Sequence, residues 1–191
     1  MKKNLITALL MTIATTVLLG FIYPMLITVL AQVLFKDKAN GQIIQRNGEA
    51  IGSRIIAQPF TGAKYFHPRP SNAGNGYDAA NSGGTNYAST NQKLIDRVRA
   101  DAAALHQENP SEAIPVDLLT TSASGLDPDI SPAAAEFQIP RVAHERGISE
   151  SLLRDLVQKH IELRNLGLLG ELRVNVLELN LALDEMSSGT H

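Results

Sequence analysis

The stretch from Leu5 to Phe35 contains no charged residue, and it constrains the fold more than any other part of the chain. About 20 apolar residues are enough to cross a bilayer as a helix, and about 30 residues reach roughly 45 Å. No later segment repeats this pattern. We therefore predict a short tail at 1–4, one transmembrane helix at 5–35 and a soluble domain at 36–191 on one side of the membrane.

A cleaved signal peptide is the alternative interpretation of this stretch. Lys2 and Lys3 form a suitable positive start, and Val29-Leu30-Ala31 loosely resembles a small-residue cleavage site. However, the apolar region of a signal peptide holds only about 7–15 residues, and this one is about twice as long. The length favours a retained anchor.

The positive charges at the two ends of the span are nearly equal, so they do not decide on which side of the membrane the domain lies. Lys2 and Lys3 precede the span, whereas Lys36, Lys38 and Arg46 follow it. The leading tail is very short, and long domains are translocated largely regardless of their charge. These two facts favour a cytoplasmic tail and an external C-terminal domain.

Small residues recur along one face of the predicted span, at steps of four. This face consists of Ala8, Thr12, Thr16 and Gly20. Such spacing allows close helix–helix approach in lipid, although threonine and alanine are also common in membrane helices for no special reason. Pro24 is expected to bend the helix, because proline lacks a backbone donor and clashes one turn back. Together these features predict a partner helix.

The composition excludes several classes of function. The chain has 17 basic and 19 acidic residues, so no electrostatic argument supports nucleic-acid binding. It has no cysteine, which rules out disulfides and thiolate chemistry. The residues after the span are numerous enough to form one self-sufficient core.

Local patterns predict a mixed α/β domain, with α+β-like character, after the span. Asn40-Gly41 and Asn47-Gly48 predict turns. The predicted strands are Gln42–Gln45, Ser53–Ala57, Val116–Thr120 and Arg173–Leu179. Helices are predicted to begin at Thr90 or Asn91, at Ser131-Pro132, at Pro140 and at Ser149. The inner face of the last helix is predicted to consist of Leu152, Leu153, Leu156, Val157 and Ile161.

Two irregular segments are candidates for function. Pro68 and Pro70 bracket Arg69 and hold the chain extended, so this arginine could be presented rigidly to an anion or a partner carboxylate. The alternative is a stiff surface loop whose aromatic residues enter the core. Residues 72–91 are rich in Asn, Gly, Ala and Ser, which predicts an irregular loop. A phosphate-binding motif is not formed there, because no lysine follows the glycines.

No catalytic or metal-binding pattern is complete. Ser122 or Ser124 with His144 and Asp127 would suggest a hydrolase, but the Gly-x-Ser-x-Gly pentapeptide is missing. Asp127-x-Asp129-x-Ser131 begins like a calcium loop, yet it lacks the central glycine and the final glutamate. The histidines have no zinc-type spacing. An accessory or binding subunit is therefore favoured over an enzyme, with no catalytic residue and no metal ligand assigned.

Several motifs, in order along nearly the whole chain, resemble the C subunits of the bacterial potassium-transporting Kdp ATPases, the KdpC family. The N-terminal span comes first, and the motifs after it are Tyr65-Phe66, Arg69-Pro70-Ser71, Ser82-Gly83-Gly84-Thr85-Asn86, Thr121-Ser122-Ala123-Ser124-Gly125-Leu126-Asp127, Ser131-Pro132, Gln138-Ile139-Pro140-Arg141-Val142-Ala143 and Val174-Asn175-Val176-Leu177-Glu178-Leu179-Asn180-Leu181-Ala182-Leu183-Asp184. The last three motifs are highly specific in their order and spacing.

The resemblance implies a non-catalytic subunit of an inner-membrane complex for potassium uptake. Its expected partners are KdpA, which translocates potassium, KdpB, which hydrolyses ATP, and the small KdpF, together with membrane lipid. The resemblance also implies a periplasmic C-terminal domain, and a face of the span (Ala8, Thr12, Thr16, Gly20) that could contact KdpA.

The family is described as a catalytic chaperone that raises the affinity of KdpB for ATP. The resemblance implies a nucleotide-contacting role for Ser82, Gly83, Gly84 and Asn86, although Thr85-Asn86 stand where the related signature has a glutamine. An external domain cannot touch cytoplasmic ATP, so any effect on ATP affinity must pass through the complex. Two alternatives remain: a nucleotide-binding regulator with a cytoplasmic domain, and an anchored external hydrolase.

Overall fold

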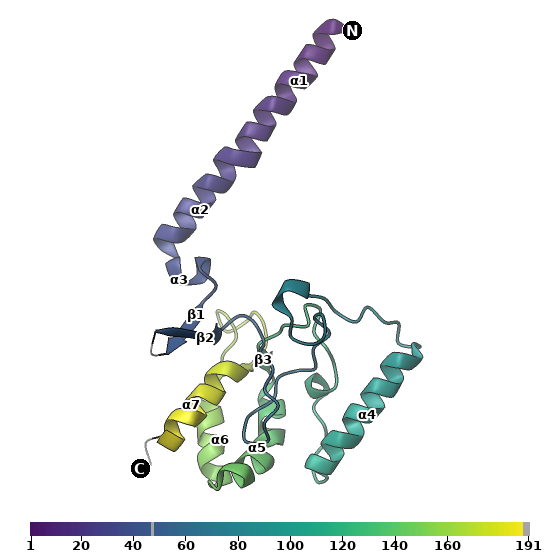
Figure 1. Cartoon of the computed structure of the whole chain (residues 1–191), viewed down its shortest axis with the longest axis vertical. Coiled ribbons are helices and arrows are strands. Elements are labelled where there is room, and N and C mark those ends of the chain that lie inside the picture. The colour runs from purple at the N-terminus through teal and green to yellow at the C-terminus, as the bar shows by residue number, and fades with distance from the viewer. Residues whose placement is uncertain (47, 189–191) are drawn as a thin grey trace. The chain divides into compact units, whose positions relative to one another are not determined.

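The computed structural model describes residues 1–46 and 48–188 (Figure 1). Asn47, which belongs to one predicted turn, and residues 189–191, which end the predicted domain, lie outside the described residues. The chain divides into two compact units, Met1–Ile51 and Gly52–His191.

The first unit begins with a continuous apolar helix, which is long and apolar enough to cross a membrane. It consists of α1 (Lys2–Val17), the π-helical turn η1 (Leu18–Ile22) and α2 (Tyr23–Leu34). None of its residues is buried, as expected for a helix whose apolar surface faces lipid or a partner. In the described part of the chain this is the one helix that meets those criteria.

The π-helical turn η1 ends at Ile22, two residues before Pro24. The Tyr23 N–H donates to the carbonyl of Leu18, five residues earlier, instead of four. Pro24 has no N–H to donate, and its ring would clash with the carbonyl of Gly20, so a locally wider turn relieves the conflict. The structure thus shows a change of helical winding beside this proline, and the expected bend stays a prediction.

After the span, α3 (Lys36–Ala39) leads into a hairpin of β1 (Ile43–Arg46) and β2 (Glu49–Ser53). The first predicted strand is confirmed as β1. The second was predicted at Ser53–Ala57 and is wrong, because the strand ends at Ser53 and the next residues form a turn. In that turn the Ser53 side chain accepts a hydrogen bond from the Ile55 N–H.

The second unit has a core built from helices and one short sheet. The sheet is antiparallel in the order β3 (Asp129–Ile130), β5 (Arg173–Asn175), β4 (Ile161–Glu162), so that Val174 lies between Ile130 and Ile161. Helices α5 (Pro132–Arg146) and α7 (Val176–Ser188) pack against β5, and α6 (Glu150–Lys159) packs against both helices (Figure 1).

The buried apolar side chains join these elements into a single cluster. Its members include Phe66, Ile130, Ile139, Val142, Leu153, Val157, Val174, Leu179 and Leu183. The helix predicted at Thr90 or Asn91 is α4 (Gln92–Glu108), with Asn91 capping its first turn. Two short 3₁₀ turns, η2 (Ala79–Asn81) and η3 (Val116–Leu118), complete the elements of this unit.

Helix α5 begins as predicted, because the Ser131 hydroxyl accepts a hydrogen bond from the Ala134 N–H and Pro132 is the first helical residue. The prediction of a separate helix at Pro140 is wrong, since α5 continues to Arg146 and ends at the left-handed Gly147. Ile139 and Val142, on either side of the proline, are fully buried. Packing of that turn outweighs the one hydrogen bond that proline removes.

Two further predicted strands differ from the structure, and in each case a side-chain hydrogen bond explains the difference. Val116–Thr120 is not a strand, because the chain turns at η3, where the Thr120 hydroxyl donates to the Val116 carbonyl. The strand predicted at Arg173–Leu179 stops at Asn175, whose side chain accepts a hydrogen bond from the Glu178 N–H and thereby caps α7. Capping by a short polar side chain ends the strand and begins the helix.

Helix α6 begins at the predicted position, with the Ser149 hydroxyl accepting from the Leu152 N–H. Leu153, Leu156 and Val157 form its buried face, as predicted. Leu152 does not belong to that face, because it is 45% exposed.

Candidate functional site

The extended segment Tyr65–Ser71 is held in the domain by two buried amide side chains. Gln138 of α5 donates from Nε2 to the His67 carbonyl at 3.1 Å, and its Oε1 accepts from the His67 N–H at 2.7 Å. Asn180 of α7 makes the same pair of bonds with Phe66, each at 2.9 Å. Both amides are 1% exposed. They satisfy buried backbone groups that would otherwise need a neighbouring strand.

Arg141 of α5 holds the start of this segment and a residue just before it. Its guanidinium donates to the carbonyls of Ala63 and Tyr65 and to Oε1 of Gln138. Its Nε lies 2.8 Å from Oε1 of Glu108 at the end of α4. One planar cation therefore joins α4, α5 and the extended segment, a role for which arginine has enough donors and lysine does not.

Arg146, at the end of α5, connects this helix to Lys64 and to α7. Its Nε donates to the Lys64 carbonyl at 2.8 Å, and its Nη2 lies 2.7 Å from Oδ1 of Asp184 on α7. The guanidinium lies 4.9 Å from the centre of the Tyr65 ring. The Tyr65 hydroxyl donates to Oδ2 of the same aspartate at 3.1 Å. The Arg146 guanidinium, the Tyr65 side chain and the Asp184 carboxylate thus stabilise one another.

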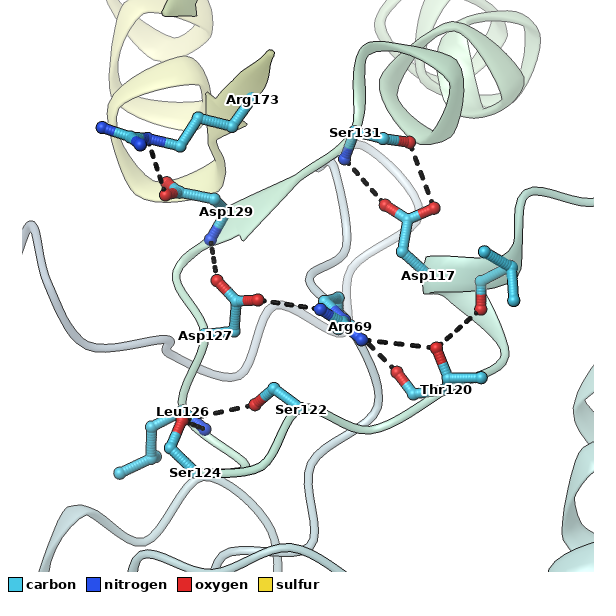
Figure 2. Close-up of polar contacts among 11 residues, drawn as sticks. Arg69, Asp117, Thr120, Ser122, Ser124, Leu126, Asp127, Asp129, Ser131 and Arg173 are labelled. Carbon is cyan, nitrogen blue, oxygen red and sulfur yellow. Dashed lines mark hydrogen bonds and ion pairs between the residues drawn. The ribbon is translucent and has the colours of Figure 1, made fainter. Parts of the chain in front are cut away.

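Arg69 lies where the extended segment meets the turn around residue 125, and Figure 2 shows its contacts. Its Nη1 donates to Oδ2 of Asp127 at 2.9 Å. Its Nε and Nη2 donate to the carbonyl and the hydroxyl of Thr120, both at 3.3 Å. The carboxylate expected opposite this arginine therefore belongs to the same chain. Phe66, an aromatic residue of the same segment, is fully buried.

An open hollow of about 570 Å³ lies beside this arginine. Asp129 Oδ2 lies 3.1 Å from Nε of Arg173, and Asn175 donates to the other oxygen. Burial nevertheless raises the pKa of Asp129 above its usual value of 3.8. Asp117 accepts from both the N–H and the hydroxyl of Ser131, as Figure 2 shows. The charged side chains that line the hollow are Arg69, Asp117, Asp127, Asp129, Glu171 and Arg173.

The calcium-like motif lies in this hollow without the geometry of a metal centre. Asp127 is paired with Arg69, and Asp129 is paired with Arg173. Ser131 caps α5 instead of facing the two carboxylates. Among the described residues, no group of three or more His, Cys, Asp or Glu side chains is arranged to hold a metal ion.

The loop predicted to contact nucleotide folds against residues 122–125. The Gly83 N–H and the Ser82 hydroxyl donate to the same carbonyl, that of Ser124, at 2.8 and 3.0 Å. Asn86 donates from its side-chain amide to the Gly84 carbonyl at 3.3 Å. A phosphate would have to replace these bonds, so the loop does not fit an open phosphate cradle. Contact between ATP and this loop stays a prediction.

The glycines of this region are explained by close approach of two backbones. A Cβ on Gly84 would lie 3.0 Å from the Ala123 carbonyl oxygen. Gly125 has a φ of +67°, and a Cβ there would lie 2.7 Å from the carbonyl oxygen of Gly83 and 2.8 Å from the Ala73 nitrogen. Any side chain at Gly125 would force the two loops apart.

The residues considered for a hydrolase make contacts with different partners. The hydroxyls of Ser122 and Ser124 lie 3.3 Å apart, and Arg69 holds Asp127. His144 lies on α5 with its side chain 86% exposed, and its Nδ1 is 3.3 Å from Glu145. The contacts described for these residues therefore join the serines to each other and leave the histidine with another partner, unlike a catalytic triad.

His67 and Tyr77 border a second hollow of about 430 Å³. The His67 ring nitrogen Nε2 lies 3.1 Å from the Gly62 carbonyl oxygen. Burial lowers the pKa of His67 below its usual 6.5, and the nearby charge of Arg141 acts in the same direction. The Tyr77 hydroxyl donates to the Arg69 carbonyl at 2.8 Å, and burial raises the pKa of this phenol.

In the first unit, the small-residue face of the span is exposed along its whole length. Ala8, Thr12 and Thr16 lie on α1, and Gly20 lies in the π turn η1. Steps of four residues form a slanted ridge of the kind that packs into the groove of another helix. The structure describes this chain alone, so the predicted helix partner stays a prediction.

The residues that hold the site together were not singled out by sequence analysis for this role. Gln138, Arg141 and Asn180 belong to the family motifs, whereas Arg146 belongs to none of them. A usable signal was present, because Gln138 and Asn180 are polar residues flanked by apolar neighbours in helical segments. A buried amide in such a position must find hydrogen-bond partners inside the protein.

Comparison with known proteins agrees with these motifs. Residues 5–185 match the family described as KdpC, the K⁺-transporting ATPase c chain. The chain is 70% identical over 184 residues to the potassium-transporting ATPase KdpC subunit of Koribacter versatilis, covering 96% of this chain and 95% of that protein. It is 54% identical to the corresponding subunit of Rhodopseudomonas palustris, covering 96% and 98% of the two chains. For Mycobacterium bovis the identity is 49%, covering 97% and 100%. The chain therefore belongs to the KdpC family.

Proposed function

We propose that this protein is an accessory subunit of an ATP-driven potassium-uptake complex, in which it stabilises the assembly. The single observation that supports this role is how the family motifs are used. Gln138, Arg141 and Asn180 bind the backbone of the Tyr65–Ser71 segment, and Arg69 binds Asp127. Their polar groups are engaged within the domain, as expected for a rigid scaffold and not for an open active site.

The apolar helix serves as a single-pass anchor in the bacterial inner membrane, with the domain on the periplasmic side. The face formed by Ala8, Thr12, Thr16 and Gly20 contacts the potassium-translocating subunit KdpA. Small side chains permit the close backbone approach on which helix association in lipid depends. KdpB and KdpF complete the complex.

The external domain covers the outer entrance of KdpA. Because the proposed topology separates the domain from cytoplasmic ATP, its effect on the ATP affinity of KdpB passes through the assembly as a coupling between sites. The Ser82-Gly83-Gly84 loop supports this view, since the Ser82 hydroxyl and the Gly83 N–H both donate to the Ser124 carbonyl. Removal of the domain is expected to alter potassium access, with only indirect effects on nucleotide binding.

The topology is tested with a reporter fused after His191 and with protease added to right-side-out spheroplasts. An external C terminus is expected. An internal terminus would refute the proposed mechanism and favour a direct nucleotide site at Ser82-Gly83-Gly84.

The helix contact is tested by co-expression with KdpA, KdpB and KdpF. Thr16→Leu enlarges a residue on the small face, whereas Ala14→Leu makes a similar change on the opposite side of α1 and serves as the matched control. Recovery of KdpA with the tagged chain should fall for Thr16→Leu and stay at the wild-type level for Ala14→Leu. Equal recovery would argue against this face.

A further inference from the structure

The π-helical turn η1 deprives one backbone carbonyl of the apolar helix of its donors. In an α-helix the Leu19 carbonyl would accept from the N–H of Tyr23, four residues later. In the structure the Tyr23 N–H donates to the Leu18 carbonyl instead. The donor five residues after Leu19, which a π-helical bond would use, is Pro24, and proline has no N–H. The Leu19 carbonyl therefore has neither its α-helical nor its π-helical donor.

The side chains of the helix do not replace the missing donor. A threonine hydroxyl in a helix donates back to a carbonyl three or four residues earlier, as Thr15 does to the Met11 carbonyl at 2.8 Å. A hydroxyl could reach the Leu19 carbonyl in this way from position 22 or 23, but these positions hold isoleucine and tyrosine. The tyrosine hydroxyl lies at the outer end of a rigid ring, away from the backbone. The donor must therefore come from outside this helix.

The Leu19 carbonyl lies at the depth of the proposed span where water is scarcest. Gly20 is the central residue of the uncharged stretch 5–35, so the carbonyl that precedes it falls near the middle of the bilayer. Lipid chains offer no hydrogen-bond donor there, and an unsatisfied backbone group in the hydrocarbon region is strongly unfavourable. A donor at this depth has to belong to another protein segment.

The carbonyl lies on the side of the helix that carries the small residues. Leu19 follows Thr12 by seven residues and Thr16 by three, and such spacings place residues on one face of a helix. The adjacent Gly20 has no side chain, and a Cβ built there would have one neighbour within 4 Å, the Thr16 methyl carbon at 3.9 Å. A side chain from another helix can therefore approach the backbone at this level.

We propose that the Leu19 carbonyl accepts a hydrogen bond from a hydroxyl or amide side chain of a neighbouring transmembrane helix. The acceptor rests on the proposed function, in which this face meets another helix, and it adds the chemical group that the partner presents: a Ser, Thr, Asn or Gln near the middle of the bilayer. Packing of small residues requires only a matching shape, whereas a single acceptor also fixes the depth of the partner's donor and so the register of the two helices. Pro24 acquires a role, because it withholds the N–H that would close this acceptor.

Solid-state NMR of the full-length chain in lipid bilayers tests the hydrogen bond directly. With ¹³C at leucine carbonyls and ¹⁵N at glycine, coupled signals arise only where leucine precedes glycine, at Leu19, Leu166 and Leu169. The Leu19 signal is the one that disappears in Gly20→Ala. Assembly with unlabelled KdpA, KdpB and KdpF should move its carbonyl resonance downfield, as hydrogen bonding does. If the labelled chain assembles and the resonance stays in place or moves upfield, only the proposed acceptor fails. If the chain does not assemble with these subunits, the proposed function fails.

Pro24→Ala tests the role of the proline in the chain co-expressed with the other subunits. Alanine supplies an N–H at position 24, so the helix can return to α-helical bonding and satisfy its own carbonyls. Recovery of KdpA with the tagged chain should fall roughly threefold to tenfold, as expected for the loss of one interhelical hydrogen bond in lipid. Val29→Ala is the matched control, because it trims a side chain of similar size on the opposite side of the helix from Gly20 and keeps every backbone donor. It should recover KdpA at the wild-type level, and equal recovery by Pro24→Ala would overturn the proposal.

Discussion

Replacement of Asn180 by alanine tests the idea that buried amides substitute for a sheet ladder. The change removes the partners of two backbone groups of Phe66, a residue with no exposed surface. Each buried polar group without a partner costs about 1–3 kcal/mol, so the free energy of unfolding should fall by roughly 2–6 kcal/mol. A domain of this size has about 5–15 kcal/mol in total, so Asn180→Ala should leave a weakened but folded protein.

Asn180→Asp separates the hydrogen-bonding effect from simple loss of volume. The new carboxyl group can still accept from the Phe66 N–H, but it can donate to the Phe66 carbonyl only when it is protonated. Burial and this bond raise its folded-state pKa, so the folded state binds the proton more tightly than the unfolded state. The free energy of unfolding should therefore decrease as pH rises above the ordinary pKa of aspartate, about 4.

Urea unfolding of the full chain in detergent micelles, followed by tyrosine fluorescence, measures both variants. Asn72→Asp is the matched control, because it makes the same chemical change at an exposed position. It should leave the unfolding free energy within about 0.5 kcal/mol of the wild type. A loss below about 1 kcal/mol for Asn180→Ala, or an Asn180→Asp variant with no added pH dependence, would refute the reasoning.

Three further predictions use the same unfolding measurement. Gly125→Ala should lower the free energy of unfolding more than Gly147→Ala does. Both glycines have a positive φ, but only at Gly125 would an added Cβ lie against backbone atoms. Equal decreases in the two variants would contradict the close approach of the two loops. Arg69→Lys should lower the free energy of unfolding by about 1 kcal/mol, because lysine cannot make the contacts of the guanidinium with Asp127 and Thr120. The decrease should largely disappear in a chain that already carries Asp127→Asn, whereas additive decreases would argue against the Arg69–Asp127 pair. Because burial lowers the pKa of His67, the unfolded chain binds the proton more tightly than the folded chain does. The free energy of unfolding should therefore be highest above about pH 6.5 and decrease as the pH falls below that value. His67→Gln should reduce this decrease at acid pH, and an unchanged pH profile in the variant would contradict the role given to His67.

The sequence by itself determined those features that depend on local physics. An uncharged apolar run is long enough to cross a membrane wherever the rest of the chain lies, and all of this run except Phe35 lies in the helix from Lys2 to Leu34. Asn91, Ser131 and Ser149 cap helices through side-chain contacts within their own first turns, so α4, α5 and α6 begin where they were predicted.

Some predictions failed at turns and caps formed by neighbouring residues, and others failed where a distant contact overrode a local preference. Pro140 predicts a break in the chain, but burial of the neighbouring apolar residues keeps α5 continuous. The alternation after Arg173 predicts a longer strand, but Asn175 turns the chain into α7, and its amide also reaches Arg54 and Asp129. The bonds to Arg54 and Asp129 join residues that are far apart in sequence, so no local pattern indicates them.

The candidate site shows the same division. Its motifs were recognisable in the sequence, yet their roles were not, because a glycine or an arginine has no fixed function until its neighbours are known. Only the folded chain brings Gly83 to Ser124, Arg69 to Asp127 and the two buried amides to the Tyr65–Ser71 segment. Tertiary structure likewise decided that the leucines between residues 163 and 172 are exposed, since an apolar residue faces solvent or core according to what the rest of the fold packs against it.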